Sequence, residues 1–129
     1  MRLLLDTHLV IWWLTDPERL PADAEAMVRD RADAVFVSRA SLWEMAIKAS
    51  IGKLRIDLAR FADAVEAAGF GWLDIRNDHL LAVAQLQAFD DHRDPFDRLL
   101  VAQSLSEPLL LLTADAKLDR YGPTVRVLA

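Results

Sequence analysis

Four acidic residues stand at places where a carboxylate can do chemistry. Two of them, Asp6 and Asp115, each follow an apolar strand-like run, in LLLDT and LLLLTAD. In an open parallel sheet, ligand sites lie beyond the carboxyl ends of the strands, so both carboxylates would face one crevice. Either aspartate could instead cap the helix that follows it. For Asp115 the two explanations are equally good, whereas an acid that closes a fully apolar strand favours a functional role for Asp6.

The segment HRDPFDRLLVAQS carries a third candidate within a helix start. Asp94 before Pro95 fits an N-cap followed by proline at the first helical position. The helix beyond is apolar nearly all round and is therefore expected to be buried, with Asp97 and Ser104 sharing a narrow polar stripe. A carboxylate near the start of a buried helix needs a metal or a basic group beside it. We therefore interpret Asp94 as structural and Asp97 as functional.

Glu44 is the fourth candidate, and its ordinary explanations are serious. It follows Ser41 at the spacing of a capping box and precedes Lys48 by one helical turn, as in a surface ion pair. Taken singly, Glu44 is better explained by structure than by catalysis. Together with the other three acids, however, it would complete a cluster of hard oxygen ligands suited to Mg²⁺ or Mn²⁺. The histidines are scattered and are interpreted as polar or packing residues: His8, His79 and His92.

The elements that must position these acids alternate between strands and helices. Strands are predicted at residues 2–6, 34–38, 72–75, 108–113 and 124–129. Helices are predicted at residues 7–13, 21–33, 41–50, 58–69, 77–89, 95–106 and 116–121. Strands separated by helices indicate βαβ units and a mainly parallel sheet. The sequence therefore predicts one α/β domain.

Composition limits the partners and the location of the protein. The chain has 129 residues, a net charge of −5 and no cysteine, which excludes disulfides and thiolate metal sites. An acidic protein is poorly suited to simple binding of phosphate backbones, so a nucleic-acid substrate would require a divalent cation. The apolar runs are too short to span a bilayer, and no cleavage pattern follows the N-terminal run. We expect a cytoplasmic protein with no membrane partner.

Four segments resemble PIN-domain proteins, and more narrowly the VapC-type toxins of bacterial toxin–antitoxin pairs. They are LLLDTHLVIWWL, VSRASLWEMAIKASIGKL, HRDPFDRLLVAQS and LLTADAKLDRYG, in the order found in the family. The resemblance implies a single PIN-like domain over residues 1–129, folded as a three-layer α/β/α sandwich with a mainly parallel central sheet. It also implies a Mg²⁺- or Mn²⁺-dependent endoribonuclease, in which metal-activated water hydrolyses RNA phosphodiester bonds.

The resemblance also assigns the site. The acids of the family that act in catalysis and metal binding match, in chain order, Asp6, Glu44, Asp97 and Asp115. Thr7 and Thr113 match small hydroxyl positions beside these acids and are expected to hold a carboxylate or a metal-bound water. Asp94 belongs to the DPFDR pattern of the subgroup and is expected to support the site while capping the helix. Candidate phosphate-binding residues are Arg39, Lys48, Arg93 and Arg98.

The partners that the resemblance implies are RNA, a second copy of the chain and an antitoxin whose C-terminal segment wraps the toxin and blocks the site. Exposed members of LVIWWL and of the region Met45–Ile47 would offer the apolar groove. Their alternative explanation is an ordinary core.

Three other functions remain open at the level of sequence. In the first, the protein is a catalytically silent interaction module in which the acids only cap helices. The second is another α/β protein that uses acids and Mg²⁺, such as a receiver domain or a DxD phosphatase, although the first strand ends in Asp-Thr-His and carries no acid pair. The third is a nuclease of the same fold that acts on another nucleic acid, because fold alone does not determine the substrate.

Overall fold

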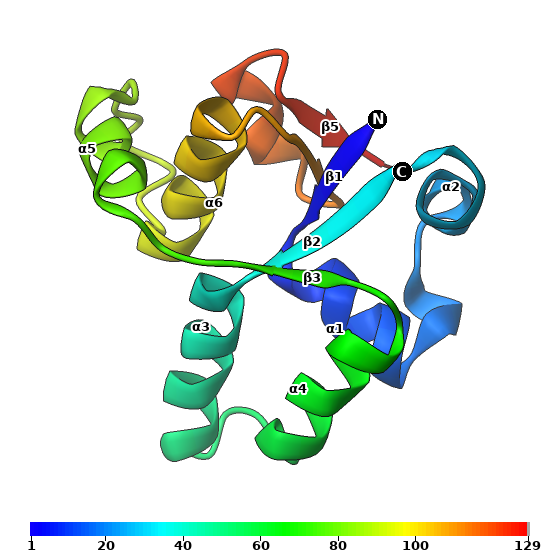
Figure 1. The fold of residues 1–129 in the computed structure, drawn as a ribbon. Coiled ribbons are helices and arrows are strands. Elements are labelled where there is room, and N and C mark those ends of the chain that lie inside the picture. Colours follow the sequence, from blue (N-terminus) through cyan, green and yellow to red (C-terminus); the bar gives the residue numbers. More distant parts are fainter. Residues whose placement is uncertain (129) are drawn as a thin grey trace.

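A five-stranded parallel sheet forms the centre of the protein in a computed structural model, which describes residues 1–128 (Figure 1). The strands are β1 (Arg2–Leu5), β2 (Ala34–Ser38), β3 (Gly71–Leu73), β4 (Leu110–Thr113) and β5 (Val125–Val127), in the order β3-β2-β1-β4-β5. The first strand is therefore central, with β2 and β4 on its two sides. This order brings the carboxyl ends of β1 and β4 side by side, which is where two of the candidate acids follow.

Helices cover both faces of this sheet. They are α1 (Thr7–Thr15), α2 (Ala22–Ala26), α3 (Arg39–Ser50), α4 (Leu58–Ala67), α5 (Asn77–Gln85) and α6 (Pro95–Ser106). Shorter turns are the 3-10 helices η1 (Pro17–Arg19) and η3 (Ala116–Tyr121) and the π-helical turn η2 (Met27–Arg31). The predicted three-layer α/β/α sandwich is confirmed. Among residues 1–128, no helix combines the length and the apolar character needed to cross a membrane.

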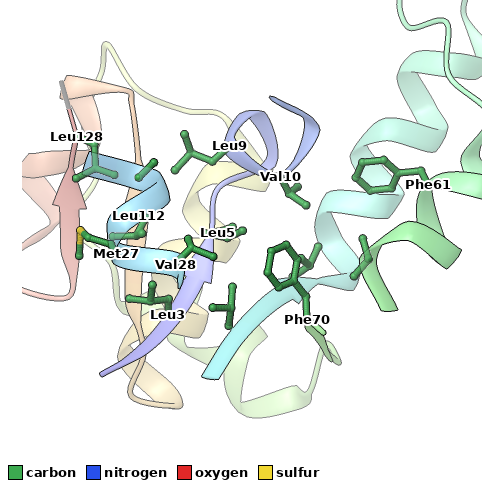
Figure 2. Packing of buried hydrophobic residues seen from close by; sticks show 14 of the residues in the cluster. Leu3, Leu5, Leu9, Val10, Met27, Val28, Phe61, Phe70, Leu112 and Leu128 are labelled. Atoms are coloured by element: carbon green, nitrogen blue, oxygen red, sulfur yellow. The ribbon is translucent and has the colours of Figure 1, made fainter. Parts of the chain in front are cut away.

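Alternating residues of β1 build the two layers of the core. Leu3 and Leu5 face the first cluster, which includes side chains from α1, η2 and α4 (Figure 2). Leu4 faces the second cluster, together with Leu100 of α6 and Leu111 of β4. All three leucines of β1 are at most 1% exposed. Because successive side chains of a strand point to opposite faces, an unbroken apolar run is what a strand buried on both sides requires.

Several element boundaries agree with the sequence and others differ from it. The strand at 34–38 and the helix at 95–106 match to the residue. The helix predicted at 77–89 ends at Gln85, because Leu86 is extended and packs into the second core cluster. The last strand, predicted at 124–129, spans Val125–Val127, and Ala129 lies outside the described residues.

The start of α3 corrects the capping explanation of Glu44. The helix begins directly after β2, with Ser38 as its N-cap, and the Ser38 hydroxyl accepts the N–H of Ala40 at 3.0 Å. Ser41 therefore lies inside the helix, where its hydroxyl lies 2.8 Å from the Thr7 hydroxyl. The capping box between Ser41 and Glu44 is wrong, because the helix starts two residues earlier than the pattern indicated.

Candidate metal centre at the carboxyl ends of the strands

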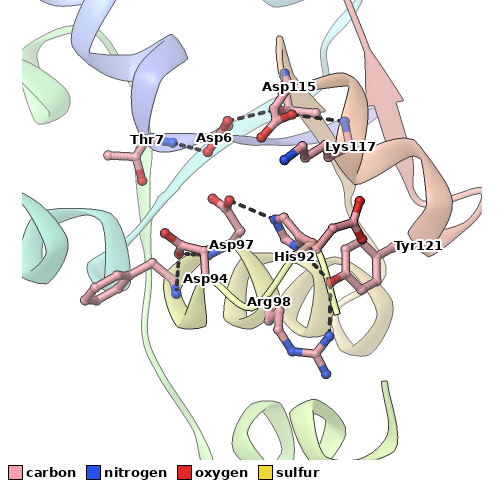
Figure 3. Close-up of polar contacts among 12 residues, drawn as sticks. Asp6, Thr7, His92, Asp94, Asp97, Arg98, Asp115, Lys117 and Tyr121 are labelled. Atoms are coloured by element: carbon pink, nitrogen blue, oxygen red, sulfur yellow. Dashed lines mark hydrogen bonds and ion pairs between the residues drawn. The ribbon is translucent and has the colours of Figure 1, made fainter. Parts of the chain in front are cut away.

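Asp6 stands at the point where β1 passes into α1, between the two neighbouring strands. Its N–H donates to the Leu112 carbonyl at 2.9 Å, which extends the pairing of β1 with β4. Its carboxylate accepts the Thr7 N–H at 2.8 Å and the Thr113 hydroxyl at 2.7 Å (Figure 3). The residue is 3% exposed, and burial raises the pKa of Asp6 despite these two hydrogen bonds, with a further contribution from the charge of Glu44. A carboxylate held here is stabilised by any cation that approaches it.

Asp97 is brought to the same place by the start of α6. The Asp94 carboxylate accepts the N–H groups of Phe96 at 2.9 Å and of Asp97 at 3.0 Å, so the predicted N-cap is confirmed. Partial burial, followed by the charges of Asp6 and Asp94, raises the pKa of Asp97 to about 7. The helix start therefore places Asp97 close enough to Asp6 for the two charges to oppose each other.

Asp115 combines the two roles that the sequence left open for it. It is the N-cap of η3 and accepts the Lys117 N–H at 3.0 Å. It also contributes a carboxylate oxygen to a group of possible metal-binding atoms, shared with Asp97 and His92, that lie within 4.8 Å of one another. The Thr113 hydroxyl accepts the Asp115 N–H at 3.1 Å while donating to Asp6, so one hydroxyl links both strand-end acids.

The two carboxylate oxygens of Glu44 have different surroundings. One of its oxygens, Oε2, accepts the Lys48 ammonium at 2.8 Å, which confirms the expected ion pair. Its other oxygen, Oε1, is buried and has no hydrogen-bond partner among residues 1–128. The hydrogen bond to Glu44, and then the charges of Glu44, Asp94 and Asp97, raise the pKa of Lys48. Glu44 and Lys48 thus belong to the same electrostatic cluster as the acids of α6.

His92 is the residue of this site that the sequence interpretation missed. It was expected to be a scattered packing residue, yet its Nε2 lies 3.2 Å from Asp97 Oδ2 and its ring is 6% exposed. The available signal was its position five residues before Asp97, in the same HRDPFD segment. His8 also borders the site, because an open pocket beside the acids is lined by Asp6, His8, Trp12, Arg19, Ala114 and Asp115.

The candidate phosphate-binding residues lie in different surroundings. Lys48 lies at the acid cluster, and Arg93 is well exposed, with its side chain 78% accessible and 3.5 Å from Asp90. Arg39 pairs with Asp74, and Arg98 donates to the Gln87 carbonyl and to the Tyr121 hydroxyl. Their role toward phosphate stays a prediction.

The donor set fits a hard divalent cation. The buried Asp6 and the half-buried Asp97 repel each other and both have raised pKa values, and one buried oxygen of Glu44 lacks a hydrogen-bond partner within residues 1–128. Oxygen ligands of this kind are what Mg²⁺ and Mn²⁺ prefer. A cation would satisfy the unpartnered Glu44 Oε1 and offset the mutual repulsion of Asp6 and Asp97.

The fold and this site define a PIN domain. The sequence profile of the PIN domain family matches residues 3–122, and the chain belongs to this family. The chain is 29% identical to the ribonuclease VapC22 of Mycobacterium tuberculosis over 124 residues, which cover 92% of this chain and 90% of that protein.

Two solved structures share the fold at low sequence identity. One is a chain of VapBC2 from Rickettsia felis, bound to a DNA fragment from the promoter, with a TM-score of 0.73, 14% identity and full coverage of both chains. The other is a chain of a toxin–antitoxin complex from Klebsiella pneumoniae, with a TM-score of 0.67, 19% identity and coverage of 96% of this chain and 95% of that one.

Proposed function

We propose that this protein is a metal-dependent endoribonuclease that acts as the toxin of a toxin–antitoxin pair, as a single PIN-like domain over residues 1–129. The observation that carries the proposal is the cluster of mutually repelling carboxylates around the buried Asp6, together with the Glu44 oxygen that has no hydrogen-bond partner in the described part of the chain. The similarity to the ribonuclease VapC22 supports RNA as the substrate.

The site would hold Mg²⁺ or Mn²⁺ through Asp6, Glu44, Asp97 and Asp115. When bound, such an ion lowers the pKa of a water molecule and offsets charge on the phosphoryl oxygens. Thr113 fixes the Asp6 carboxylate by its hydrogen bond, and the Asp94 cap places Asp97 at the first turn of α6. Lys48 neutralises one oxygen of Glu44 and leaves the other available.

The RNA strand would lie over the open pocket beside the acids. The wall of this pocket includes the Trp12 ring. The Arg19 guanidinium lies 5.1 Å from the centre of that ring, and the centre of the His8 ring lies 5.9 Å from it. Planar aromatic and guanidinium groups stack on nucleobases without strict sequence preference. Arg93, the most exposed of the predicted basic residues, would contact phosphate from the start of α6.

An antitoxin and a second copy of the chain complete the proposal. Within the predicted apolar groove, Met45 is fully buried and belongs to the core, so the surface must come from its neighbours. Trp43, Ile47 and Ile51 of α3 and the following turn are 55%, 39% and 60% exposed. This apolar strip beside the site supports a binding surface for an antitoxin helix.

Expression without an antitoxin tests the function directly. We expect the wild type to arrest growth and to produce new RNA 5′ ends, and Asp97→Asn to do neither. Asp63→Asn, which removes an exposed acid of α4, is the matched control and should behave as the wild type. The purified protein should cleave RNA in the presence of Mg²⁺ or Mn²⁺, and cleavage should stop when EDTA is added. Equal cleavage by the wild type and Asp97→Asn would refute the nuclease site.

A further inference from the structure

His92 connects the acid cluster to a second layer of polar groups. Its Nε2 lies 3.2 Å from Asp97 Oδ2, and its Nδ1 lies 2.7 Å from the Tyr121 hydroxyl (Figure 3). The two rings also pack edge to face, with their centres 5.4 Å apart. Both ring nitrogens of this buried histidine are therefore engaged. The chain of contacts continues to Arg98, whose Nη1 lies 3.0 Å from the Tyr121 hydroxyl.

The donor and acceptor of each hydrogen bond in this series can be assigned starting from Arg98. A guanidinium group can only donate, so the Tyr121 oxygen accepts from Arg98. The tyrosine O–H is then free to donate to His92 Nδ1, and in this arrangement the imidazole carries its hydrogen on Nε2. From there it donates to Asp97, and every donor has an acceptor. The opposite tautomer would direct two donors at Tyr121 and set the lone pair of Nε2 against a carboxylate.

We propose that His92 is a positioning residue, held by Tyr121 and Arg98 in the Nε2–H form, which fixes Asp97 by donating to Oδ2 and leaves Oδ1 for the cation. The inference rests on the metal site of the proposed function. It assigns His92, Tyr121 and Arg98 to the support of Asp97, and it gives Arg98 a role distinct from the binding of phosphate.

Neighbouring side chains hold this series of hydrogen bonds in place. The Phe89 ring packs against the Tyr121 ring, with their centres 5.2 Å apart. The backbones of Phe89 and His92 also form an isolated antiparallel β-bridge. Arg98 also donates to the Gln87 carbonyl at 3.0 Å, which ties the loop before α6 to the helix. The loop and η3 thus hold the imidazole in one orientation, as partners of metal-binding side chains commonly are.

A direct metal–histidine bond is the competing role. Nε2 lies among the atoms grouped with Asp97 and Asp115, but it would have to lose its hydrogen to bind an ion. Hydrogen would then move to Nδ1, and the Tyr121 O–H would lose His92 as its acceptor. Mg²⁺ and Mn²⁺ also favour oxygen over imidazole, so the donating role is the better fit.

Three variants separate these roles when Mn²⁺ binding is measured by calorimetry without RNA. His92→Leu removes the donor, and we expect it to weaken Mn²⁺ binding by about 10- to 100-fold. His92→Gln restores an N–H and should recover most of the affinity. Tyr121→Phe keeps the ring and removes only the hydroxyl, so a several-fold loss at an unchanged melting temperature is expected. Glu107 lies outside the site, so Glu107→Gln is the control and should bind Mn²⁺ as tightly as the wild type does.

A second readout does not depend on the metal. Long-range ¹H–¹⁵N correlation spectra of the metal-free protein should show the Nε2–H form of His92 in the wild type and a mixture of tautomers in Tyr121→Phe. An Nδ1–H form in the wild type would overturn the inference even if the protein is an active nuclease. So would wild-type affinity for Mn²⁺ in a folded His92→Leu variant, or equal losses in His92→Gln and His92→Leu. Absence of Mn²⁺ binding in the wild type would overturn the proposed function itself.

Discussion

Two clusters within residues 1–128 each combine one histidine with two acidic residues, yet they differ in how far the protein satisfies their hydrogen-bonding groups. In each, three possible metal-binding atoms lie within 4.8 Å of one another: His92, Asp97 and Asp115 in the first, and Asp78, His79 and Glu107 in the second. The first lies at the carboxyl ends of β1 and β4, beside Asp6. The second joins the start of α5 to the end of α6.

The second cluster is internally satisfied. His79 Nδ1 accepts the Arg76 N–H at 3.0 Å, so its hydrogen is on Nε2, which lies 2.5 Å from Glu107 Oε2. Asp78 pairs with the Arg76 guanidinium at 3.0 Å. Each of the three side chains thus has a hydrogen-bonding or ionic partner, and neither nitrogen of His79 could bind an ion without losing a hydrogen bond, which indicates a structural role.

The first cluster has the opposite balance. Its acids oppose one another, and the neighbouring Glu44 has an oxygen without a partner among residues 1–128. Proximity of metal-binding residue types is therefore a poor guide to a metal site. The informative quantity is how much of their charge and hydrogen-bonding capacity the protein itself leaves unmet.

Removal of one carboxylate from each cluster should give the largest difference between the two clusters. Asp97→Asn should lower RNA cleavage and Mn²⁺ affinity by on the order of 100-fold or more, because loss of a ligand costs at least as much as loss of its hydrogen-bond partners. Glu107→Gln should leave both unchanged. Calorimetry and single-turnover cleavage assays measure the two effects, and equal losses in the two variants would contradict the distinction.

Removal of the buried histidine of the second cluster should affect stability alone. His79 is fully buried, and His79→Leu leaves Glu107 and the Arg76 N–H without their partner. We expect the free energy of unfolding to fall by about 1–3 kcal/mol, since an unsatisfied buried polar group costs about that much and the half-buried Glu107 can still be hydrated. Urea denaturation measures this loss. The gain in melting temperature on adding Mn²⁺ should persist, and its disappearance would mean that the second cluster also serves the metal.

The repulsion between the acids of the first cluster should make stability depend on pH. The pKa of Asp97, raised to about 7, means that the folded protein binds this proton more tightly than the unfolded chain. Its contribution to stability is present in full below the unfolded pKa and is lost as the pH rises through about 7. In EDTA, Asp97→Asn should therefore gain melting temperature over the wild type as the pH rises from about 6 to about 8.5. Parallel curves would contradict this.

The hydroxyl that joins the strand-end acids should give the smallest effect. Thr113→Val keeps the shape of the side chain and removes the hydrogen bond to Asp6. A loss of about tenfold in cleavage is expected, since a hydrogen bond to a charged group is worth about 1.5–3 kcal/mol and the bound cation would compensate in part. Thr124→Val, which removes a comparable hydroxyl at Ser104 away from the site, is the control. Equal cleavage by both variants would remove Thr113 from the site.

Features that depend on local chemistry could be predicted from the amino-acid sequence. The apolar run of β1, the Asp94-Pro95 start of α6 and the strand-end position of Asp6 were all predictable from residue type and spacing. They follow from side-chain alternation in buried strands, from capping and from the rule that parallel strands present their carboxyl ends to one edge.

Which histidine lies beside the acids, and why Glu44 is a strong candidate, depend on how the elements pack in three dimensions. The hydrogen bond between His79 and Glu107 joins residues that are 28 positions apart in the sequence. The hydrogen bond from Thr113 to Asp6 spans 107 positions. Burial and long-range hydrogen bonds of this kind leave no periodic signal in the chain, because they arise when separate elements pack together. The same packing satisfies the cluster around His79 and leaves an oxygen of Glu44 without a partner among the residues that the structure describes, which is the physical difference between a structural group and a candidate metal centre.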